Sequence, residues 1–519
     1  MSPLALVSVS DKTNIIQLSK VLVEKFGYKI ISSGGTADYL INSNIPVLKV
    51  SEYTNSPEIL NGRVKTLHPK IHGGILAKRS NDSHIKELKE NKIELIDLVV
   101  VNLYPFQKKI DEKCDWEEAI ENIDIGGPSM IRSAAKNHKD VSVLVNPNQY
   151  DEFIKMLSNG NVDNSYRTKL AYEAFQHTAN YDAIISNWIS EEKKIAPQFH
   201  IEPYPLIRSL RYGENPHQEA KWYGLKDWGW NAAKQIQGKE LSYNNLLDLE
   251  AALTTILEFG YENKTHLNNS NLVNAAVILK HNNPCGAAIG ESLSKAFEKA
   301  LECDSISAFG GIVAFNKKVD SKTAELLSNI FLECIVAPSF SKDALSILSK
   351  KRNLRLLELN KNMIIPNHKG SCKSIMGGLL IQDFDNKIVN SQEWKTVTQK
   401  KPSEQQLKDL KFSWQICKHV KSNAIVIAKN QKTIGIGAGQ MNRVGSAKIA
   451  LENAGNNCQE AVLASDGFFP FSDTVSIAHE YGIKAIIQPG GSMRDEESIK
   501  KCDEKGISMI FTQRRHFLH

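Results

Sequence analysis

The run Leu4-Ala-Leu-Val-Ser-Val9 is apolar, branched and of strand length, and it leads directly into Ser10-Asp-Lys-Thr13, where a helical pattern starts. The residues that follow repeat this arrangement. The predicted strands are Leu4–Val9, Lys29–Ser32, Leu95–Leu103 and Val141–Val145, and the helical patterns between them include Lys12–Phe26 and Thr36–Asn42. Strands that alternate with helices form βαβ units around a parallel sheet. The sequence therefore predicts an α/β fold that begins with a parallel-sheet domain.

The bulk composition bounds the class of protein. The chain has 519 residues, 41% hydrophobic and 24% charged, so two to four globular domains are expected. No apolar run approaches the ~20 residues that span a bilayer, and the N-terminus lacks the basic start of a signal peptide. The net charge of +6 includes no long Lys/Arg run, and the eight cysteines form no C-x-x-C pair. We expect a cytoplasmic protein with reduced cysteines that binds no membrane and no nucleic acid.

A proline-rich segment marks the predicted domain boundary. Ala196-Pro-Gln-Phe-His-Ile-Glu-Pro-Tyr-Pro205 holds three prolines, and proline resists both helix interiors and central strands. The predicted domains are therefore residues 1–196 and residues 204–519.

The second domain contains an internal duplication. Asn274-Ala-Ala-Val-Ile-Leu-Lys-His-Asn282 and Asn423-Ala-Ile-Val-Ile-Ala-Lys-Asn-Gln431 share Asn, Ala, Val, Ile and Lys in register. Small residues follow each lysine, at Pro284-Cys-Gly-Ala-Ala288 and Gly435-Ile-Gly-Ala-Gly439, and we interpret both stretches as turns before a helix. Two similar α/β units, roughly residues 204–365 and 366–519, explain this pattern. Two copies are too few for a solenoid.

Two early turns of the first domain suit a nucleotide phosphate. Glycine lets a ligand approach the backbone, hydroxyls donate hydrogen bonds, and the first N–H groups of a helix face an anion. The alternative interpretation is two ordinary helix N-caps. Because both turns follow strands at the same edge of a parallel sheet, we favour phosphate binding, although neither is a Walker A loop. The candidates are Ser10, Lys12, Thr13, Ser33, Gly34, Gly35 and Thr36.

Further polar candidates lie in three later segments of this domain. A Pro-broken stretch holds Arg63 and Lys65, which project to the same side if the chain is extended there. Tyr104 follows an apolar strand at the edge where α/β folds bind ligands, and the equal alternative is an aromatic cap on the core. His68 and His72 lack the glutamate of an H-E-x-x-H zinc motif. The candidates are Arg63, Lys65, Thr66, Tyr104, Asp124, Gly126, Gly127 and Lys136.

Lys280 and His281 form the most reactive combination of the second domain. Histidine suits proton transfer near neutral pH, and an adjacent lysine supplies positive charge to a leaving nitrogen or an oxyanion. Zinc deaminases use H-x-E…P-C-x-x-C, and Pro284-Cys285 fits part of that motif. The second cysteine and the glutamate are absent, so we reject zinc chemistry here. Arg211 and Tyr212 lie in a turn-rich polar stretch.

Two further features of the second domain are candidates. A glycine-rich turn ends at Gln440 and opens a helix with Arg443 in its first turn. The C-terminal residues Arg514-Arg-His-Phe-Leu-His519 are basic and aromatic enough to dock in a site, although chain ends are usually disordered.

Taken in order, these segments resemble one family over essentially the whole chain, the bifunctional AICAR formyltransferase / IMP cyclohydrolase, where AICAR is an aminoimidazole carboxamide ribonucleotide. The motifs that carry the resemblance are Ser10-Asp-Lys-Thr, Ser33-Gly-Gly-Thr, Arg63-Val-Lys-Thr-Leu-His-Pro, Asn102-Leu-Tyr-Pro-Phe, Asp124-Ile-Gly-Gly, Leu210-Arg-Tyr-Gly-Glu-Asn-Pro-His-Gln, Lys280-His-Asn-Asn-Pro, Ser307-Ala-Phe-Gly-Gly, Gly437-Ala-Gly-Gln and Arg515-His-Phe-Leu-His.

For the first domain, the resemblance implies a fold like methylglyoxal synthase and the cyclohydrolase activity, which closes formylated AICAR (FAICAR) to IMP with loss of water. Lys65, Tyr104, Asp124 and Lys136 match the family's catalytic groups. The turns Ser10–Lys12 and Ser33–Thr36 match its phosphate cradle.

For the second domain, the resemblance implies the formyltransferase, built from two cytidine-deaminase-like units that lack zinc. His281 matches the base, Lys280 the group that assists the leaving folate nitrogen, and Asn423 the group that orients the formyl oxygen. The formyl donor implied is 10-formyltetrahydrofolate, no metal is required, and the family is a homodimer with transferase sites at the subunit interface. The substrate-binding positions implied are Arg211, Tyr212, Phe309, Gly310, Gln440, Arg443 and His519.

The chain departs from the family pattern at few positions. Asn442 and Gly445 stand where we expect Ser and Asp, and Gly467 stands where we expect Ala. These changes bear on local folate or nucleotide contacts. Two other functions compete with this one: a zinc deaminase, which the missing ligands oppose and which stoichiometric zinc in a metal analysis would revive, and a nucleotide sensor without turnover, which an activity assay would reveal.

Overall fold

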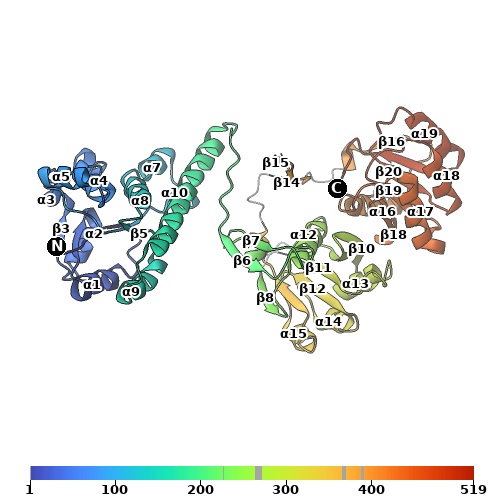
Figure 1. Cartoon of the computed structure of the whole chain (residues 1–519). Helices are drawn as coiled ribbons and strands as arrows, with labels where there is room; N and C mark the ends of the chain where they lie inside the picture. Colours follow the sequence, from blue (N-terminus) through green and yellow to red (C-terminus); the bar gives the residue numbers. More distant parts are fainter. Residues whose placement is uncertain (1, 226, 263–271, 365–369, 387–390) are drawn as a thin grey trace. The chain divides into compact units, whose positions relative to one another are not determined.

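The computed structural model of the chain describes residues 2–225, 227–262, 272–364, 370–386 and 391–519 (Figure 1). The chain forms two compact units, Met1–Pro203 and Tyr204–His519. The boundary predicted between residues 365 and 366 lies outside the described residues. No helix within the described ranges is long and apolar enough to cross a membrane.

The first unit is built on a five-stranded parallel sheet in the order β3-β2-β1-β4-β5. Its strands are β1 (Leu4–Val9), β2 (Lys29–Ser32), β3 (Val47–Lys49), β4 (Leu98–Asn102) and β5 (Ser142–Leu144). The predictions for β1 and β2 are confirmed to the residue, whereas β4 and β5 are shorter than predicted. The edge strand β3 has three residues, too few to show a periodic pattern, and it was not predicted.

Helices connect these strands, as the βαβ pattern predicts. They are α1 (Ile15–Phe26), α2 (Gly34–Ile41), α3 (Val50–Thr54), α4 (Pro69–Leu76), α5 (Asp82–Glu90), α6 (Phe106–Asp111), α7 (Trp116–Glu121), α8 (Gly126–Lys136), α9 (Tyr150–Ser158) and α10 (Asn164–Lys193). The strand order reverses its direction between β1 and β4. In such sheets a crevice opens at the carboxyl ends of these two strands, which is the usual ligand site.

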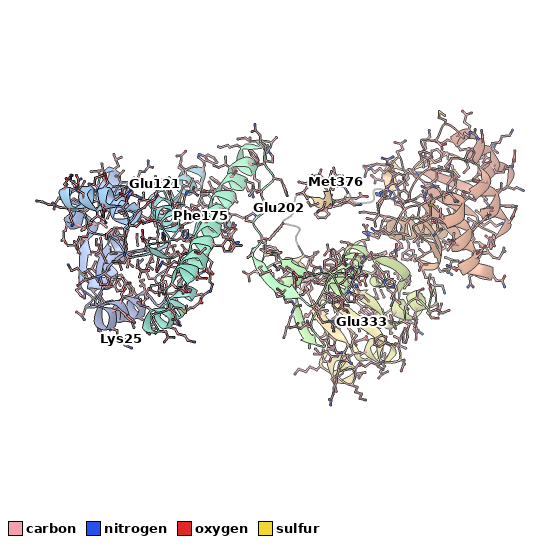
Figure 2. All side chains as sticks on the ribbon, viewed as in Figure 1. Lys25, Glu121, Phe175, Glu202, Glu333 and Met376 are labelled. Carbon is pink, nitrogen blue, oxygen red and sulfur yellow. The ribbon has the colours of Figure 1, made fainter. Side chains whose placement is uncertain are left out.

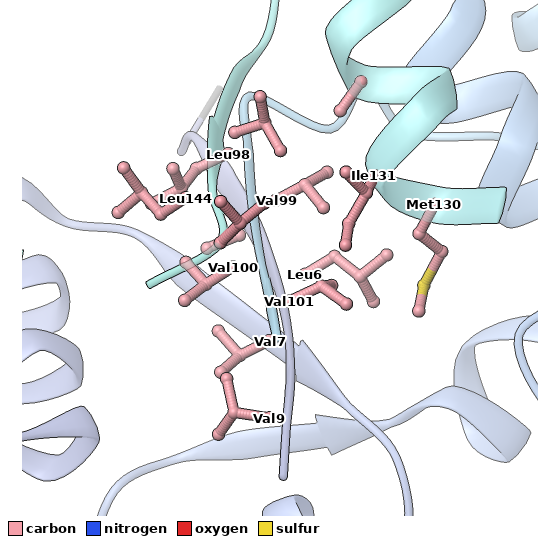
Figure 3. Close-up of a cluster of buried hydrophobic side chains, with 14 of the residues drawn as sticks. Leu6, Val7, Val9, Leu98, Val99, Val100, Val101, Met130, Ile131 and Leu144 are labelled. Carbon is pink, nitrogen blue, oxygen red and sulfur yellow. The ribbon is translucent and has the colours of Figure 1, made fainter. Parts of the chain in front are cut away.

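The central strands carry the core of the first unit. Every residue of β4 is buried, and Leu6, Val7, Val99 and Val100 have no exposed surface (Figure 3). Residues Met130 and Ile131 of α8, labelled in the same view, belong to this cluster. Each such side chain contributes about 1.5–3 kcal/mol when it leaves water. The sheet and α8 therefore form a rigid base for the loops at its carboxyl edge.

The second unit holds a twelve-stranded mixed sheet in the order β16-β21-β20-β19-β17-β18-β10-β9-β11-β12-β13-β8. Its first half has β8 (Lys234–Gln237), β9 (Asn274–Lys280), β10 (Asn283–Gly290), β11 (Gly311–Phe315), β12 (Leu332–Ala337) and β13 (Arg355–Glu358). Its second half has β16 (Lys395–Thr396), β17 (Ile425–Lys429), β18 (Lys432–Gly437), β19 (Val462–Ser465), β20 (Ala485–Gln488) and β21 (Ser508–Phe511).

The helices of the second unit repeat in the same way. The first copy has α12 (Tyr243–Leu257), α13 (Leu293–Leu301), α14 (Ser321–Ser328) and α15 (Lys342–Leu348), and the second has α16 (Glu404–Cys417), α17 (Arg443–Ala454), α18 (Asp473–Glu480) and α19 (Asp495–Glu504). Each strand of the first half has a counterpart at the same distance from the centre of the sheet, so that β10 corresponds to β18, β9 to β17 and β11 to β19. The predicted duplication is therefore confirmed, with β10 and β18 meeting at the centre.

The small-residue stretches were interpreted as turns, but Pro284–Ala288 lies within β10 and Gly435–Gly437 ends β18, so only Ala438 and Gly439 lie in a connection to a helix. The turns lie just before the two strands, at His281–Asn282 and Asn430–Gln431, and all four residues have positive φ. Glycines follow because helices pack directly on these strands. A Cβ at Gly286 would overlap the Ala300 carbonyl of α13, and one at Gly435 would overlap the equivalent Ala450 carbonyl of α17.

Two small hairpins and several short helices complete the second unit. The hairpins pair β6 (Leu206–Leu210) with β7 (Ala220–Tyr223), and β14 (Ser371–Ile375) with β15 (Gly378–Gln382). The short helix α11 spans Gly229–Ala232. All residues of β15 and four of the five in β14 are exposed in a single chain.

Candidate active sites

Asn102 joins the two strands at the switch point of the first unit. Its Oδ1 accepts the N–H of Ser10 at 2.7 Å and of Asp11 at 2.9 Å, and its Nδ2 donates to the Asp11 carbonyl at 2.9 Å. Only 8% of Asn102 is exposed. These bonds fix the Ser10–Lys12 turn at the carboxyl edge of the sheet. Sequence reasoning did not count Asn102 as a site residue, although a polar residue ending an apolar strand was the available signal.

Some polar groups of the Ser10–Thr13 turn bond within the turn, and others remain available to a ligand. Thr13 donates its N–H and its hydroxyl to Asp11 at 2.9 Å and 2.6 Å, and the hydroxyl bond lowers the pKa of Asp11. No side chain caps α1, whose N-cap is Asn14. The Ile15 N–H that begins α1 donates to the Lys12 carbonyl at 3.3 Å, so the N–H groups placed to face an anion are the later ones of the first turn, while the Thr13 hydroxyl serves Asp11.

The second predicted turn opens α2 with Ser33 as its N-cap, and the Ser33 side chain makes no capping bond. A Cβ at Gly34 would stand 3.3 Å from Lys65 Nζ, so the ammonium lies against the first turn of this helix. Thr36 has another role, because its buried Oγ1 bonds the N–H and the carbonyl of Val9 at 3.1 Å and 2.9 Å. Thr36 links α2 to β1, Ser33 is buried with its hydroxyl 3.5 Å from Ser8 Oγ, and the open part of the turn is Gly34–Gly35.

Lys65 lies between this turn and an acidic neighbour. Its Nζ is 3.9 Å from Glu58 Oε2. Arg63 points elsewhere and pairs with Glu121 of α7, with 3.2 Å between Arg63 Nε and Glu121 Oε1. Arg63 and Lys65 were expected on the same side only if the chain is extended there, and this condition is not met, because Arg63 follows the helical turn Leu60–Gly62 with φ −65° and ψ −26°.

Asp124 gathers the remaining groups at the start of α8. Its Oδ1 accepts the Gly127 N–H at 2.8 Å. A Cβ on Gly127 would lie 2.5 Å from Asp124 Oδ2, and one on Gly126 would lie 2.7 Å from Thr66 Oγ1. Burial raises the pKa of Asp124, against the opposing effects of the Gly127 N–H and the Lys65 charge. A carboxyl with a raised pKa suits proton transfer.

Two tyrosines contact Asp124, whereas Lys136 lies at a distance from it. The backbone of Tyr104 bonds the Asp124 carboxyl, and its side chain is 44% exposed, which opposes the core-cap interpretation. The Asp124 N–H donates to the Tyr181 hydroxyl at 2.9 Å, a contact from α10 that no local sequence pattern indicates. Lys136 is exposed at the other end of α8, about 15 Å from Gly126 along the axis. The described contacts do not bring Lys136 to Asp124.

In the second unit, the β9–β10 hairpin presents Lys280 and His281. Lys280 Nζ donates to the carbonyls of Phe309 and Gly310, both at 3.0 Å. His281 has φ 51° and an exposed side chain. The copy at Lys429 repeats the first contact, because Lys429 Nζ donates to the Gln459 carbonyl at 2.7 Å. The duplicated fold therefore fixes the lysine, and only the first copy has a histidine beside it.

Asn423 is held at both ends of its amide. Its Nδ2 donates to the Gln440 carbonyl at 2.8 Å, and its Oδ1 accepts from Arg443 at 2.8 Å. Arg443 is 6% exposed and also bonds Ser465 Oγ at 2.8 Å and pairs with the buried Asp466. Arg443 thus orients Asn423 from inside the fold. We predicted that Arg443 binds substrate, but in the structure its guanidinium is bonded to the protein instead.

The C-terminal tail docks, as predicted. Leu518 and Ser422 exchange two hydrogen bonds at 2.9 Å and 3.1 Å, and Lys421 Nζ donates to an oxygen of His519 at 2.6 Å. The N–H of Lys421 donates to Asn283 Oδ1 at 3.0 Å. This bond joins the tail and Asn423 to the Lys280–His281 hairpin, so one edge of the four central strands carries all of these groups.

Arg211 and Tyr212 lie in the loop after β6. Arg211 donates to the Tyr212 hydroxyl at 2.9 Å and lies over its ring, 4.6 Å from the centroid. Asn244 of α12 donates to the Glu214 carbonyl at 3.3 Å, which ties this loop to the helix beneath the hairpin. Phe309 is 62% exposed and packs on the Phe331 ring at 5.2 Å.

The zinc alternative depends on Cys285. Burial raises the pKa of Cys285 to about 12, which opposes the thiolate that zinc needs. Among the described residues, no group of three His, Cys, Asp or Glu side chains could hold a metal ion.

Comparisons with known proteins identify the family. Residues 134–453 match the AICARFT/IMPCHase bienzyme family, and residues 14–129 match the MGS-like domain, which confirms the fold predicted for the first unit. Two proteins of Prochlorococcus marinus, strains MIT 9215 and MIT 9515, are called "Bifunctional purine biosynthesis protein PurH". They are 68% and 67% identical over 519 residues and are covered completely, as is this chain.

A solved structure titled "Crystal structure of ForH" is 35% identical and covers 36% of this chain and 97% of its own, with a TM-score of 0.33 that is too low to bear on the fold. The bienzyme match extends over more than half of the chain. The chain therefore belongs to the AICARFT/IMPCHase bienzyme family and is a bifunctional enzyme of purine biosynthesis.

Proposed function

We propose that the unit Met1–Pro203 carries the cyclohydrolase and the unit Tyr204–His519 the formyltransferase, with 10-formyltetrahydrofolate as the formyl donor and the cytoplasm as the place of action. The amine of AICAR attacks the formyl carbon, the bond from that carbon to folate N10 breaks, and one proton moves from the amine to N10. FAICAR and tetrahydrofolate leave. The carboxamide nitrogen of FAICAR then attacks its formyl carbon, and loss of water gives IMP.

The β9–β10 hairpin is the observation that carries the transferase proposal. An ammonium has three N–H donors, and the carbonyls of Phe309 and Gly310 take two of those on Lys280. The third is left for the substrate, where it can protonate the departing N10. The exposed His281 is the base that takes the proton of the AICAR amine.

Asn423 orients the formyl oxygen in this proposal. Gln440 and Arg443 fix the plane of its amide, and the second N–H of Nδ2 is left to bind the oxygen. Arg211, Tyr212 and Phe309 are proposed to bind substrate, and His519, docked on Lys421, closes the same edge of the sheet.

The cyclohydrolase proposal uses the groups around Asp124. The uncapped start of α1 and the Ser33–Gly35 turn bind the nucleotide phosphate, with Lys65 as the counter-charge. Tyr104 and Lys65 orient the carboxamide, and Asp124 handles protons. Lys136 has no step in this scheme, because the length of α8 separates it from Asp124 within one chain.

We also propose a homodimer with transferase sites at its interface. The β14–β15 hairpin exposes apolar side chains on both faces, including Met376 at its tip, which is fully exposed (Figure 2), and Leu379 and Leu380 at 49% and 57%. A lone two-stranded hairpin is marginally stable, so it requires a partner, and a second copy of the chain supplies one. Asp385, just beyond the hairpin, bonds His516 of the tail, which leads to the Asn423 cluster.

The duplicated hairpin supplies the test. His281→Ala should abolish formyl transfer by the full-length protein, and Asn430→Ala, at the matching position of the copy, should leave it within about twofold. Equal losses in both variants, or none in His281→Ala, would contradict the transferase proposal.

A further inference from the structure

The two copies of the hairpin are held by matching aspartates that bond differently. In the second copy, Asp409 of α16 accepts the N–H of Asn430 at 2.9 Å through Oδ2 and of Gln431 at 2.7 Å through Oδ1. Its Oδ1 also accepts from Gln405 at 3.0 Å, and the residue is 3% exposed. Asp409 therefore uses both oxygens to close a turn that has no histidine.

In the first copy, Asp248 of α12 leaves one oxygen over. Its Oδ1 accepts the Asn282 N–H at 2.7 Å. Among the described residues, its Oδ2 has no hydrogen-bond partner, and Asp248 is half-buried under the turn. The spare oxygen thus occurs in the copy whose turn carries His281. Burial raises the pKa of Asp248, against the opposing effects of the Asn282 N–H and of the charges of His281 and Lys280.

Three cations lie around this turn: Lys280 on β9, Lys421, which precedes β17 and is joined to the turn through Asn283, and Arg211, in the loop that Asn244 ties to α12. Lys421 also donates to an oxygen of the C-terminal His519 at 2.6 Å, and the Arg211 loop contains Glu214. Asp248 is the carboxylate placed to compensate when His281 takes a proton.

We propose that Asp248 is a positioning residue for His281: one carboxylate oxygen fixes the left-handed turn, and the other stabilises the imidazolium formed when the substrate amine gives up its proton. This inference rests on the proposed role of His281 as base. The step moves one proton from the amine to the imidazole while the new N–C bond forms, so the charge that appears on His281 is balanced by the charge already on Asp248.

Asp248→Asn tests the proposal, because the amide keeps an acceptor for the Asn282 N–H and removes the charge. In the full-length enzyme we expect kcat of formyl transfer to fall about 10- to 100-fold, within the span of a base contribution. The KM for AICAR should stay within about twofold. The acid limb of the kcat/KM profile should move to lower pH, because the imidazole is harder to protonate. Asp248→Glu, which keeps the charge, should retain the parent's acid limb.

Asp409→Asn is the matched control and should leave kcat and the acid limb unchanged. Cyclisation of added FAICAR shows that the first unit of each preparation is folded and active, and thermal unfolding shows that the second unit is folded. If Asp248→Asn does not fold, Asp248→Ser, which also offers an acceptor without charge, replaces it with the same expected profile. An unmoved acid limb, or the same losses in Asp409→Asn, overturns the proposal. Activity that survives in His281→Ala instead overturns the proposed base, so the two failures are distinguishable.

Discussion

Replacement of Asn102 by Ala tests whether the switch point of the first unit organises the nucleotide site. The change removes three hydrogen bonds of 2.7, 2.9 and 2.9 Å at a side chain that is 8% exposed. At about 0.5–1.5 kcal/mol for each bond, the free energy of unfolding falls by about 2–4 kcal/mol. A unit of this size then loses roughly 5–15 °C in Tm.

The functional effect should exceed simple loss of stability. Without Asn102, the Ser10–Lys12 turn must be ordered by the ligand itself, and a cost of about 1.4 kcal/mol raises KM about tenfold. Cyclisation of FAICAR, followed by IMP absorbance, measures this KM at a temperature where the variant is folded. Formyl transfer by the same sample should be unchanged.

Asn137→Ala is the matched control for this prediction. Asn137 is also buried in the first unit, where its Nδ2 donates to the carbonyls of Ile75 and Ala77 at 2.8 Å and 3.1 Å. It should lower the Tm and leave the KM for FAICAR near that of the parent. A parent-like KM in Asn102→Ala, or an equal rise in Asn137→Ala, refutes the reasoning.

Three further predictions follow from other contacts. Asp124→Asn should abolish cyclisation without lowering the free energy of unfolding at pH 7. Because the pKa of Asp124 is raised, the folded state binds this proton more readily than the unfolded state, and the buried carboxylate destabilises the fold increasingly as pH rises through the folded pKa. The amide carries no charge and therefore removes this penalty. Unfolding in urea at pH 5 and pH 8 measures the difference, and a large loss at pH 8 contradicts it. Lys280→Met should lower kcat of formyl transfer by about 10²–10⁴-fold with little change in KM for AICAR, and a mainly altered KM would assign Lys280 to binding. The double variant Leu379→Asp, Leu380→Asp should shift the protein to monomers in light scattering and lower formyl transfer while cyclisation persists, and an unaltered dimer contradicts the proposed interface.

The regular parts of the fold could be predicted because they depend on local patterns. Strands β1 and β2 match their apolar runs to the residue, and the duplication was visible in nine-residue segments. The small residues of β10 and β18 misled the prediction, because glycine signals a turn locally and here serves the close approach of α13 and α17. Such approach depends on tertiary packing, which sequence spacing does not report.

The candidate sites were predicted in part for the same reason. Lys65, Tyr104 and Asp124 gather at one edge, and the hairpin presents Lys280 and His281, since these residues lie at strand ends that the topology brings together. The side chains of Thr36 and Arg443 form hydrogen bonds within the protein instead of facing a ligand, and the residue type alone does not distinguish these two roles. Tyr181 was not predicted because its partner Asp124 lies 57 residues away, and Asn102, whose partner Ser10 lies 92 residues away, was missed although a polar residue at the end of an apolar strand was an available signal.

The most direct test of a bifunctional chain with one activity in each unit is a product analysis with AICAR and 10-formyltetrahydrofolate. The parent, His281→Ala and Lys65→Ala are compared for release of tetrahydrofolate and for formation of FAICAR and IMP. The account predicts that the parent releases tetrahydrofolate and forms IMP. From AICAR, His281→Ala should do neither at a normal rate. Lys65→Ala should release tetrahydrofolate and accumulate FAICAR. Loss of formyl transfer in Lys65→Ala, or no tetrahydrofolate release from the folded parent, would contradict it.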